Sequence, residues 1–266
     1  IITRACRNSD KWKDSNLSQR DSGFIMILAV DIGNTNVTCG VYSGKKWVHT
    51  LRLPSTLNFW NQFSTLKEFD ITESAISSVV PNLTQVYIES IRNLFQIDAH
   101  IITCQNSGVE LLVDTPKDVG IDRICNVIAA KEIVGTPAIV GDIGSATNYD
   151  VVDENGAFIG GAIAPGIEVA AHNLIERAAL LKETAFIVPE SAVGKTTESN
   201  LQSGIMLGAI DVVDGMFHRI MDEMKWDKCN IIVTGGFGGL ISPHLKTKHN
   251  YLPNLTLEGI RIIYEK

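Results

Sequence analysis

An Asp-Ile-Gly motif between two apolar strands occurs twice in this chain, and it limits the possible folds more than any other feature. The first copy is Asp31-Ile32-Gly33, and the second is Asp142-Ile143-Gly144. In both copies, small and polar residues separate two apolar runs, a pattern that is typical of a tight β-hairpin. A repeated unit of this kind predicts two similar half-domains that face one cleft.

The first hairpin has the residue types that a phosphate-binding turn requires. Gly33 tolerates the backbone angles of such a turn, and Asn34, Thr35 and Asn36 leave polar donors free to bind phosphate. Asp31, at the end of the first strand, can reach a metal ion or a metal-bound water. An ordinary polar hairpin contains the same residue types, so this motif alone leaves both interpretations open. The second copy favours phosphate binding.

The composition is that of a soluble globular protein. The 266 residues suffice for two medium domains or one large one, and 45% of them are apolar and 20% charged. No apolar run reaches the roughly 18 residues of a membrane-spanning helix, so we expect no membrane partner. The net charge of −7 argues against a nucleic-acid partner. The five cysteines form no C-x-x-C pair, which is typical of reduced thiols in the cytoplasm.

Residues 1–25 differ from the rest of the chain. They are polar and mixed in charge, without the apolar stretch of a signal peptide. We interpret them as a polar leader, either an upstream extension or a remnant of expression, and expect the folded chain to begin at Met26. The two copies of the motif then predict an N-terminal half-domain at 26–137 and a C-terminal half-domain at 138–266.

The order of the other predicted elements indicates an α/β protein. Short apolar runs predict buried strands, and apolar residues at helical spacing predict helices. We expect further strands at 47–53, 74–81, 99–102, 158–163 and 229–234, and helices at 57–69, 83–95, 167–181 and 198–224.

A third polar motif, Gly120-Ile121-Asp122-Arg123, precedes apolar residues at helical spacing, so Asp122 and Arg123 fall in the first turn of a helix. The helix dipole keeps a carboxylate there ionised, and an ionised carboxylate can accept a proton from an alcohol. Arg123 can bind a substrate carboxylate or phosphate. A first-turn aspartate that only stabilises its helix has the same sequence, so both roles stay open at this point.

Two glycine pairs complete the pattern. Gly235-Gly236 follows a buried strand and suits an adenosine-sized ligand on the backbone, or a plain turn. Gly204 and Gly208 allow another backbone to approach the helix at 198–224, which we expect to form a dimer interface. Gly194-Lys195-Thr196-Thr197 is not a P-loop, because Pro189 stands where that motif needs its first glycine.

In this order and spacing, the motifs resemble those of the type III pantothenate kinases, in the acetate and sugar kinase, Hsc70 and actin superfamily. The resemblance extends from Met26 to the C-terminus and implies an actin-like ATPase fold, in which two ribonuclease H-like α/β half-domains face a central cleft. It rests on the segments 31–36, 77–81, 120–123, 142–147, 160–166, 234–236 and 257–259.

The resemblance implies an enzyme that transfers the γ-phosphate of ATP to the hydroxyl of pantothenate. The product is 4'-phosphopantothenate, and the reaction is the first step of coenzyme A biosynthesis. The family works in the cytoplasm as a homodimer, with Mg²⁺ and a monovalent cation, K⁺ or NH₄⁺. We therefore expect ATP, pantothenate and a second copy of the chain as partners.

The resemblance also assigns roles to single residues. Asp122 matches the proton acceptor and Asp142 the ligand of the monovalent cation. Asp31 matches the first ATP-phosphate loop, and on physical grounds we expect it to act on magnesium through water. The ATP-binding residues implied are Asp31, Ile32, Gly33, Asn34, Thr35, Asn36, Val37, Thr38 and Ser145. The pantothenate-binding residues implied are Val113, Gly120, Ile121, Asp122, Arg123 and Thr197.

Three positions depart from the family pattern. Ser145 and Asn148 stand where the family often has threonine, and Val113 stands where a substrate-contacting tyrosine is usual. Serine keeps the hydroxyl, so the phosphate contact can survive, whereas Val113 bears on pantothenate affinity more than on fold. No clear copy of the family's usual Leu-Pro follows the helix that ends near Leu181. Three alternatives stay open: a non-catalytic accessory regulator of transcription, another small-molecule kinase or polyphosphate phosphatase, and a two-metal nuclease that uses Asp31, Asp122 and Asp142.

Overall fold

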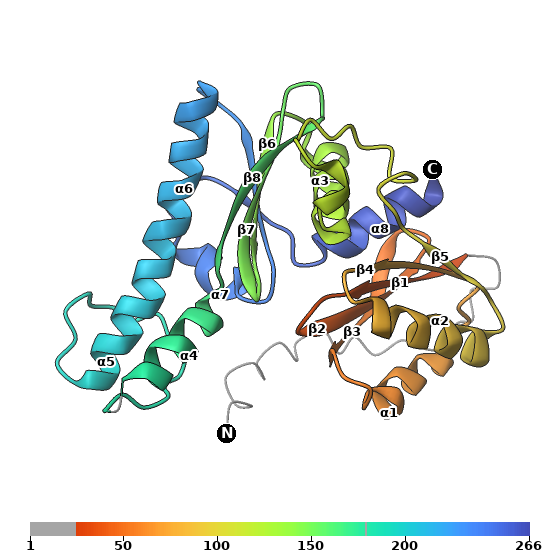
Figure 1. Ribbon diagram of the computed structural model, residues 1–266, viewed down its shortest axis with the longest axis horizontal. Helices are drawn as coiled ribbons and strands as arrows, with labels where there is room; N and C mark the ends of the chain where they lie inside the picture. The colour runs from red at the N-terminus through yellow and green to blue at the C-terminus, as the bar shows by residue number, and fades with distance from the viewer. Residues whose placement is uncertain (1–24, 179) are drawn as a thin grey trace.

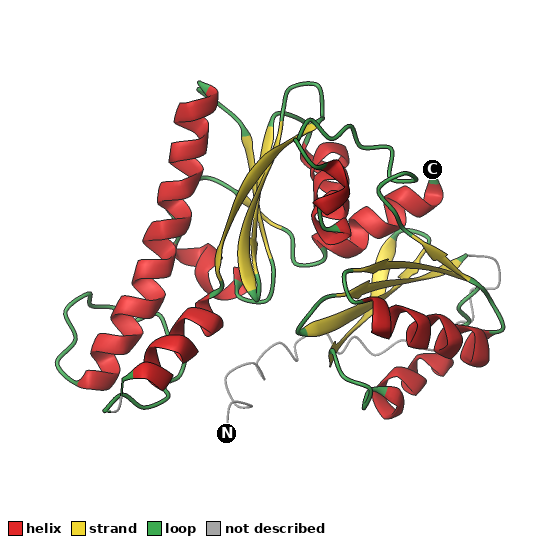
Figure 2. Cartoon of the chain, viewed as in Figure 1, coloured by secondary structure: helices red, strands yellow, loops and turns green. Residues whose placement is uncertain are grey.

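The computed structural model describes residues 25–178 and 180–266, so the predicted leader lies almost entirely outside the described residues. Two five-stranded sheets form the framework (Figures 1 and 2). The first has the order β3–β2–β1–β4–β5, with β1 Met26–Ile32, β2 Asn36–Ser43, β3 Lys46–Pro54, β4 Glu73–Ser78 and β5 Ala99–Ile101. The second has the order β10–β9–β6–β7–β8, with β6 Ala138–Ile143, β7 Ala146–Val152, β8 Phe158–Pro165, β9 Asn230–Thr234 and β10 Asn250–Tyr251.

The two sheets have the same topology. In each, the first three strands in the chain pair antiparallel, and the first strand also pairs parallel with the fourth, which in turn pairs parallel with the fifth. β1 corresponds to β6, and the Asp-Ile-Gly motifs end these two strands at equivalent places. The predicted α/β class and the two similar halves are confirmed.

Helices cover the outer faces of both sheets. α1 (Trp60–Phe63), a 3₁₀ turn (Ser64–Glu68) and α2 (Pro81–Phe95) cover the first sheet, where the rings of Phe59 and Tyr87 stack. α4 (Ile167–Arg177), α5 (Thr197–Gln202), α6 (Gly208–Met224) and α7 (Gly238–Ile241) lie with the second sheet (Figure 1). β1 is buried on both faces, which explains why its sequence is a continuous apolar run.

Two helices fill the space between the sheets. α3 (Ile121–Val134) follows the last strand of the first sheet but contacts β6 and β7 of the second, and α8 (Leu255–Glu265) follows the last strand of the second sheet but contacts β1, β2 and β4. α3 and α8 also pack against each other (Figure 1). A Cβ on Gly259 would collide with the main-chain oxygen of Cys125, so this glycine permits the close helix contact. The proposed boundary between residues 137 and 138 stays a prediction.

Three predicted helices differ in extent from those observed. The helix expected at 57–69 is a short α-helix followed by a 3₁₀ turn, because the Ser64 and Thr65 hydroxyls bond back to main-chain carbonyls. The helix expected at 167–181 ends at Arg177. The helix expected at 198–224 is interrupted by a π-helical segment, Ser203–Leu207, next to Gly208. In the described part of the chain, no helix combines the length and apolar character needed to cross a membrane.

Candidate active site

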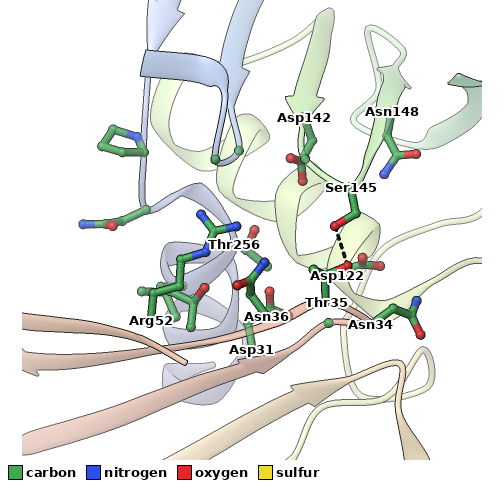
Figure 3. A pocket seen from close by; sticks show the side chains of 18 of the residues that line it. Asp31, Asn34, Thr35, Asn36, Arg52, Asp122, Asp142, Ser145, Asn148 and Thr256 are labelled. Atoms are coloured by element: carbon green, nitrogen blue, oxygen red, sulfur yellow. Dashed lines mark hydrogen bonds between the residues drawn. The ribbon is translucent and has the colours of Figure 1, made fainter. Parts of the chain in front are cut away.

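A cavity of about 620 Å³ lies between the two halves (Figure 3). The turns of both Asp-Ile-Gly hairpins line it, together with the end of β3, the start of α3, the Gly235-Gly236 turn and the segment between β10 and α8. Because equivalent strands end at the same cleft, the two copies of the motif lie opposite each other. The predicted central cleft is therefore confirmed as a place where the hairpins meet.

The two hairpins contact each other directly. Each turn is closed by a main-chain hydrogen bond, from Gly33 to the Asn36 oxygen (3.0 Å) and from Gly144 to the Ala146 oxygen (2.9 Å). The Ser145 hydroxyl donates to the Thr35 hydroxyl oxygen across the cleft, at 2.8 Å. The tips of both turns thus present hydroxyl and amide groups to one small volume, as an anion-binding site requires.

Three carboxylates from distant parts of the chain line the same cavity: Asp31, Asp122 and Asp142. Burial raises the pKa of Asp31 to about 8, the negative charge of Asp122 adds to the increase, and the hydrogen bond from Ser77 (3.2 Å) opposes it. Burial also raises the pKa of Asp142 to about 6. Burial makes the ionised form of both carboxylates costly, and a bound cation would compensate their charge.

A hydrogen-bond chain fixes the Asp142 carboxylate. The Asn126 side-chain amide donates to Asp142 Oδ2 at 3.1 Å, and the Thr256 hydroxyl donates to Asn126 Oδ1 at 2.8 Å. Asn126 lies one helical turn after Asp122 on α3, and Thr256 lies in α8. The sequence analysis missed both residues, although the spacing of four between Asp122 and Asn126 is a signal that they share a helix face.

The described residues of the site offer a cation single carboxylates and not a cluster of ligands. Among residues 25–178 and 180–266, no three His, Cys, Asp or Glu side chains gather closely enough to hold a metal ion. Asp31 and Asp142 each fit a cation that takes its other ligands from water and from phosphate oxygens, which is usual for Mg²⁺ at phosphate sites.

Asp122 lies in the first turn of α3, as predicted. Its Oδ1 accepts the main-chain N–H of Arg123 at 2.9 Å. A Cβ on Gly120 would lie only 2.5 Å from the same oxygen, so the missing side chain of Gly120 leaves the space that the carboxylate occupies. The Gly120-Ile121-Asp122 sequence therefore sets the position of this carboxylate locally.

Arg123 points away from Asp122, toward the second sheet. Its Nε donates to Asp150 Oδ1 at 2.6 Å, and its guanidinium lies 5.2 Å from the centre of the Phe158 ring. Asp150 is fully buried in β7, and its second oxygen has no hydrogen-bond partner among the described residues. The sequence analysis missed Asp150, although a carboxylate inside the apolar run Tyr149–Val152 is a signal for a buried partner.

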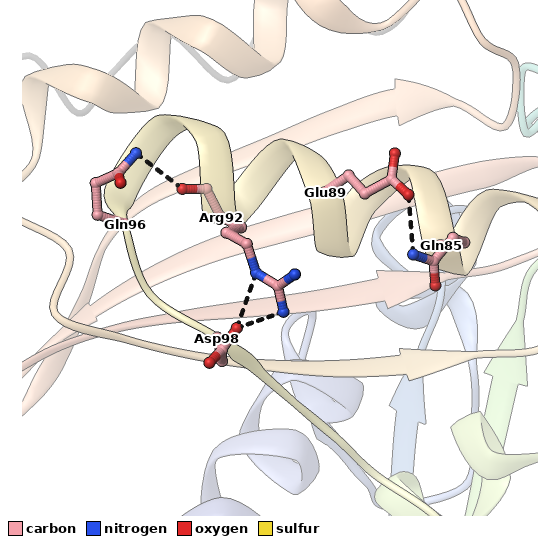
Figure 4. Close-up of polar contacts among 5 residues, drawn as sticks. All are labelled: Gln85, Glu89, Arg92, Gln96 and Asp98. Carbon is pink, nitrogen blue, oxygen red and sulfur yellow. Dashed lines mark hydrogen bonds and ion pairs between the residues drawn. The ribbon is translucent and has the colours of Figure 1, made fainter.

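We expect Asp150→Ala to lower the free energy of unfolding by about 3 kcal/mol, because it leaves a largely buried guanidinium unpaired. Asp150→Asn should cost less, since the amide oxygen can still accept from Arg123. The matched control is Asp98→Ala, which removes the exposed ion pair of Asp98 with Arg92 (Figure 4) and should cost under about 1 kcal/mol. Urea unfolding measures all three, and equal losses for Asp150→Ala and Asp98→Ala would contradict the role of the buried pair.

Other predicted site residues lie outside this cavity. Ile32 and Val37 are buried and hold the first hairpin, and Ile121 packs between the sheets. Val113 packs beside α3 and β6. Thr197 lines a separate apolar groove of about 740 Å³ between α4 and the α5–α6 segment. Contact of these residues with a ligand stays a prediction.

The two equal halves, with paired Asp-Ile-Gly hairpins at the cleft between them, define an α/β protein of the actin-like ATPase fold. The family model of the type III pantothenate kinases matches residues 27–219. The chain belongs to the type III pantothenate kinase family.

Several known proteins are similar to this chain. The type III pantothenate kinase of Agathobacter rectalis is 37% identical over 253 residues, which cover 91% of this chain and 97% of the relative. That of Thermomicrobium roseum is 39% identical, with the same coverage. Among solved structures, the activator of 2-hydroxyisocaproyl-CoA dehydratase from Clostridium difficile, with bound ADPNP, covers 90% of this chain and 94% of its own, at 13% identity and a TM-score of 0.49.

Proposed function

We propose that this cleft transfers the γ-phosphate of ATP to the hydroxyl of pantothenate, the first step of coenzyme A biosynthesis. The observation that carries the proposal is the meeting of both hairpins and of Asp31, Asp122 and Asp142 in one cavity, in a chain of the type III pantothenate kinase family. Phosphoryl transfer needs little covalent help, but it needs the two substrates in line and their charge neutralised. The cleft offers groups for both tasks.

The hairpins hold the polyphosphate in this proposal. The Thr35 and Ser145 hydroxyls, which bond to each other, exchange that bond for phosphate oxygens. Kinases of this kind use a divalent metal, and we assign Mg²⁺ to Asp31 through water. When bound there, the metal would neutralise charge on the phosphates. Asp142, fixed by Asn126, would hold K⁺ or NH₄⁺.

Asp122 accepts the proton of the pantothenate hydroxyl as that oxygen attacks phosphorus. It lies in the first turn of α3, on the wall of the cavity that both hairpins line. Arg123, oriented by Asp150, binds the pantothenate carboxylate. Val113, in place of the usual tyrosine, weakens pantothenate binding without changing the chemistry.

Gly120→Ala should reduce turnover because it displaces the Asp122 carboxylate. The backbone of Gly120 has a φ of −58°, which alanine adopts without strain, so the protein should fold. The added methyl group would lie 2.5 Å from Asp122 Oδ1 and must displace it. We expect a loss of about 100-fold in kcat, of the size that follows from a misplaced reacting group. Steady-state kinetics with a melting curve measures this, and an unchanged kcat in a folded variant would contradict the assigned position of the carboxylate.

The proposed homodimer explains the position of Thr197. This residue, assigned to pantothenate, lies on the apolar groove away from Asp122, so it reaches a substrate in the cleft only from a second copy. Exposed apolar side chains beside the groove, Leu174 (47%) and Val212 (55%), support a covered face. Sedimentation should give a dimer, and Val212→Asp should give a monomer with a raised KM for pantothenate. A monomeric wild type would refute the dimer.

A cytoplasmic location stays a prediction.

The first experiment measures ADP release from ATP with Mg²⁺ and K⁺, with and without pantothenate. Pantothenate-dependent ADP that disappears when K⁺ and NH₄⁺ are omitted supports both the activity and the role of Asp142. Tight ATP binding without pantothenate-dependent turnover would contradict the proposal. It would point to the departures at Val113 and Asn148, and to another substrate or a non-catalytic role.

A further inference from the structure

Arg52 reaches across the cleft, although no motif of the sequence includes it. The residue belongs to β3 in the first half, and its guanidinium lies against the Gly235-Gly236 turn of the second half (Figure 3). A Cβ on Gly236 would lie 2.7 Å from Arg52 Nη1 and 2.9 Å from Nη2. The side chain therefore spans the two halves at the cavity that also holds both hairpins.

Arg52 supplies the positive charge of the cavity. Among the described residues that line the cavity, it is the only lysine, arginine or histidine, whereas three carboxylates face the same space. An ATP molecule adds several negative charges to this volume, so a fixed cation there favours its binding.

The guanidinium of Arg52 has no protein partner in the described part of the chain. The ion pairs there involve other cations: Arg92 with Asp98, Arg123 with Asp150, Arg261 with Glu258 and Glu265, and Lys266 with Glu132. A guanidinium carries five N–H donors in a planar fork that matches phosphate oxygens. Unpaired donors inside a cavity, beside two hairpins rich in hydroxyl groups, form the cationic side of an anion site.

We propose that Arg52 is a further catalytic residue, which binds oxygens of the ATP polyphosphate and stabilises the charge that develops during transfer. The assignment rests on the proposed function. In the transfer, the pantothenate oxygen forms a bond to the γ-phosphorus, and the bond from that phosphorus to the β–γ bridging oxygen breaks. The bridging oxygen leaves on ADP with the electron pair, and the hydroxyl proton goes to Asp122. Arg52 contributes charge and hydrogen bonds and exchanges no proton.

The test compares Arg52→Gln and Arg52→Lys with the matched control Arg92→Gln. Arg92 lies on α2 of the same half, exposed and paired with Asp98 outside the cleft (Figure 4). Each variant is assayed for kcat and for KM of ATP. Separately, titrations with ATP, ADP and adenosine report binding through the melting temperature. Adenosine lacks phosphate, so it reports the integrity of the site without the contact in question.

We expect Arg52→Gln to lower kcat by about 10²–10³-fold, the effect of removing one donor aimed at developing charge. It should weaken binding of ATP and ADP but leave adenosine binding unchanged, and Arg52→Lys should recover part of the loss. Arg92→Gln should match the wild type. If Arg52→Gln lowers the melting temperature of the ligand-free protein but binds ATP and ADP as the wild type does, the residue is only structural and the proposal fails.

The failure of this proposal is distinct from a failure of the pantothenate assignment. If the wild type releases no ADP with pantothenate but binds ATP, and Arg52→Gln loses that binding, Arg52 still binds phosphate and only the acceptor is wrong. If the wild type turns over and Arg52→Gln turns over equally well, the role of Arg52 is wrong and the pantothenate assignment stands.

Discussion

Asp122→Asn should lose pantothenate-dependent ADP release by a factor of about 10²–10⁴, the range for removing a general base. Asparagine keeps the shape of the side chain, and its amide oxygen can still accept the N–H of Arg123 at the position observed for Asp122 Oδ1. It cannot accept a proton from an alcohol. The loss should therefore appear in kcat, while the stabilisation by ATP should not decrease, because a negative charge near the phosphates is removed.

A control of the same chemistry is Asp118→Asn, which changes an exposed aspartate four residues earlier and outside the cavity. It should retain the wild-type rate. Steady-state kinetics and thermal shift with ATP measure both variants. If Asp122→Asn turned over as fast as Asp118→Asn, the assignment of Asp122 as the proton acceptor would be wrong.

Asp31→Asn should abolish turnover and stabilise the ligand-free protein at pH 8. The pKa of Asp31 rises from 3.8 to about 8, first through burial and then through the charge of Asp122. Between about pH 4 and pH 8 the folded protein keeps a proton that the unfolded chain has released. The contribution of this group to stability is therefore present below pH 4 and is lost as the pH rises toward 8.

An asparagine at position 31 has no such proton, so the free energy of unfolding should depend less on pH in the variant. One pKa unit corresponds to about 1.4 kcal/mol. The free energy of unfolding of Asp31→Asn should therefore exceed that of the wild type by several kcal/mol at most at pH 8, and by almost nothing at pH 4. Urea unfolding from pH 4 to pH 8 in chelator, without nucleotide, measures the difference. The control is Asp70→Asn, an exposed residue of the same half. If the free energy of unfolding depended on pH equally in the wild type and in Asp31→Asn, the raised pKa assigned to this carboxylate would be wrong.

Much of the fold could be predicted because its signals are local. The apolar runs on both sides of Asp31-Ile32-Gly33 and Asp142-Ile143-Gly144 predicted the strands of both hairpins, and the repeat predicted two halves of equal topology. The helix bounds were less accurate. Hydroxyl groups that bond back to the main chain and a π-helical segment depend on the surrounding structure, and the apolar spacing alone does not reveal them.

The candidate site also has a part that the sequence predicts and a part that it does not. The residues within each motif, such as Gly120 and Asp122, lie close together because few bonds separate them, and their spacing was sufficient to predict this. The partners of these residues come from other elements. Asp150 meets Arg123, and Thr256 meets Asn126, only because α3 packs both on the second sheet and against α8. No spacing in the sequence encodes such a meeting.

The sequence by itself determined the class of protein, the two Asp-Ile-Gly hairpins and the three carboxylates, because each of these is a contiguous pattern with its own local chemistry. Only the tertiary structure decided that Arg52 enters the cleft and that Thr197 lies apart from it. The physical reason is that the cleft forms between two sheets joined by α3 and α8. A side chain of one half can contribute to the cleft only where the fold places the other half opposite it.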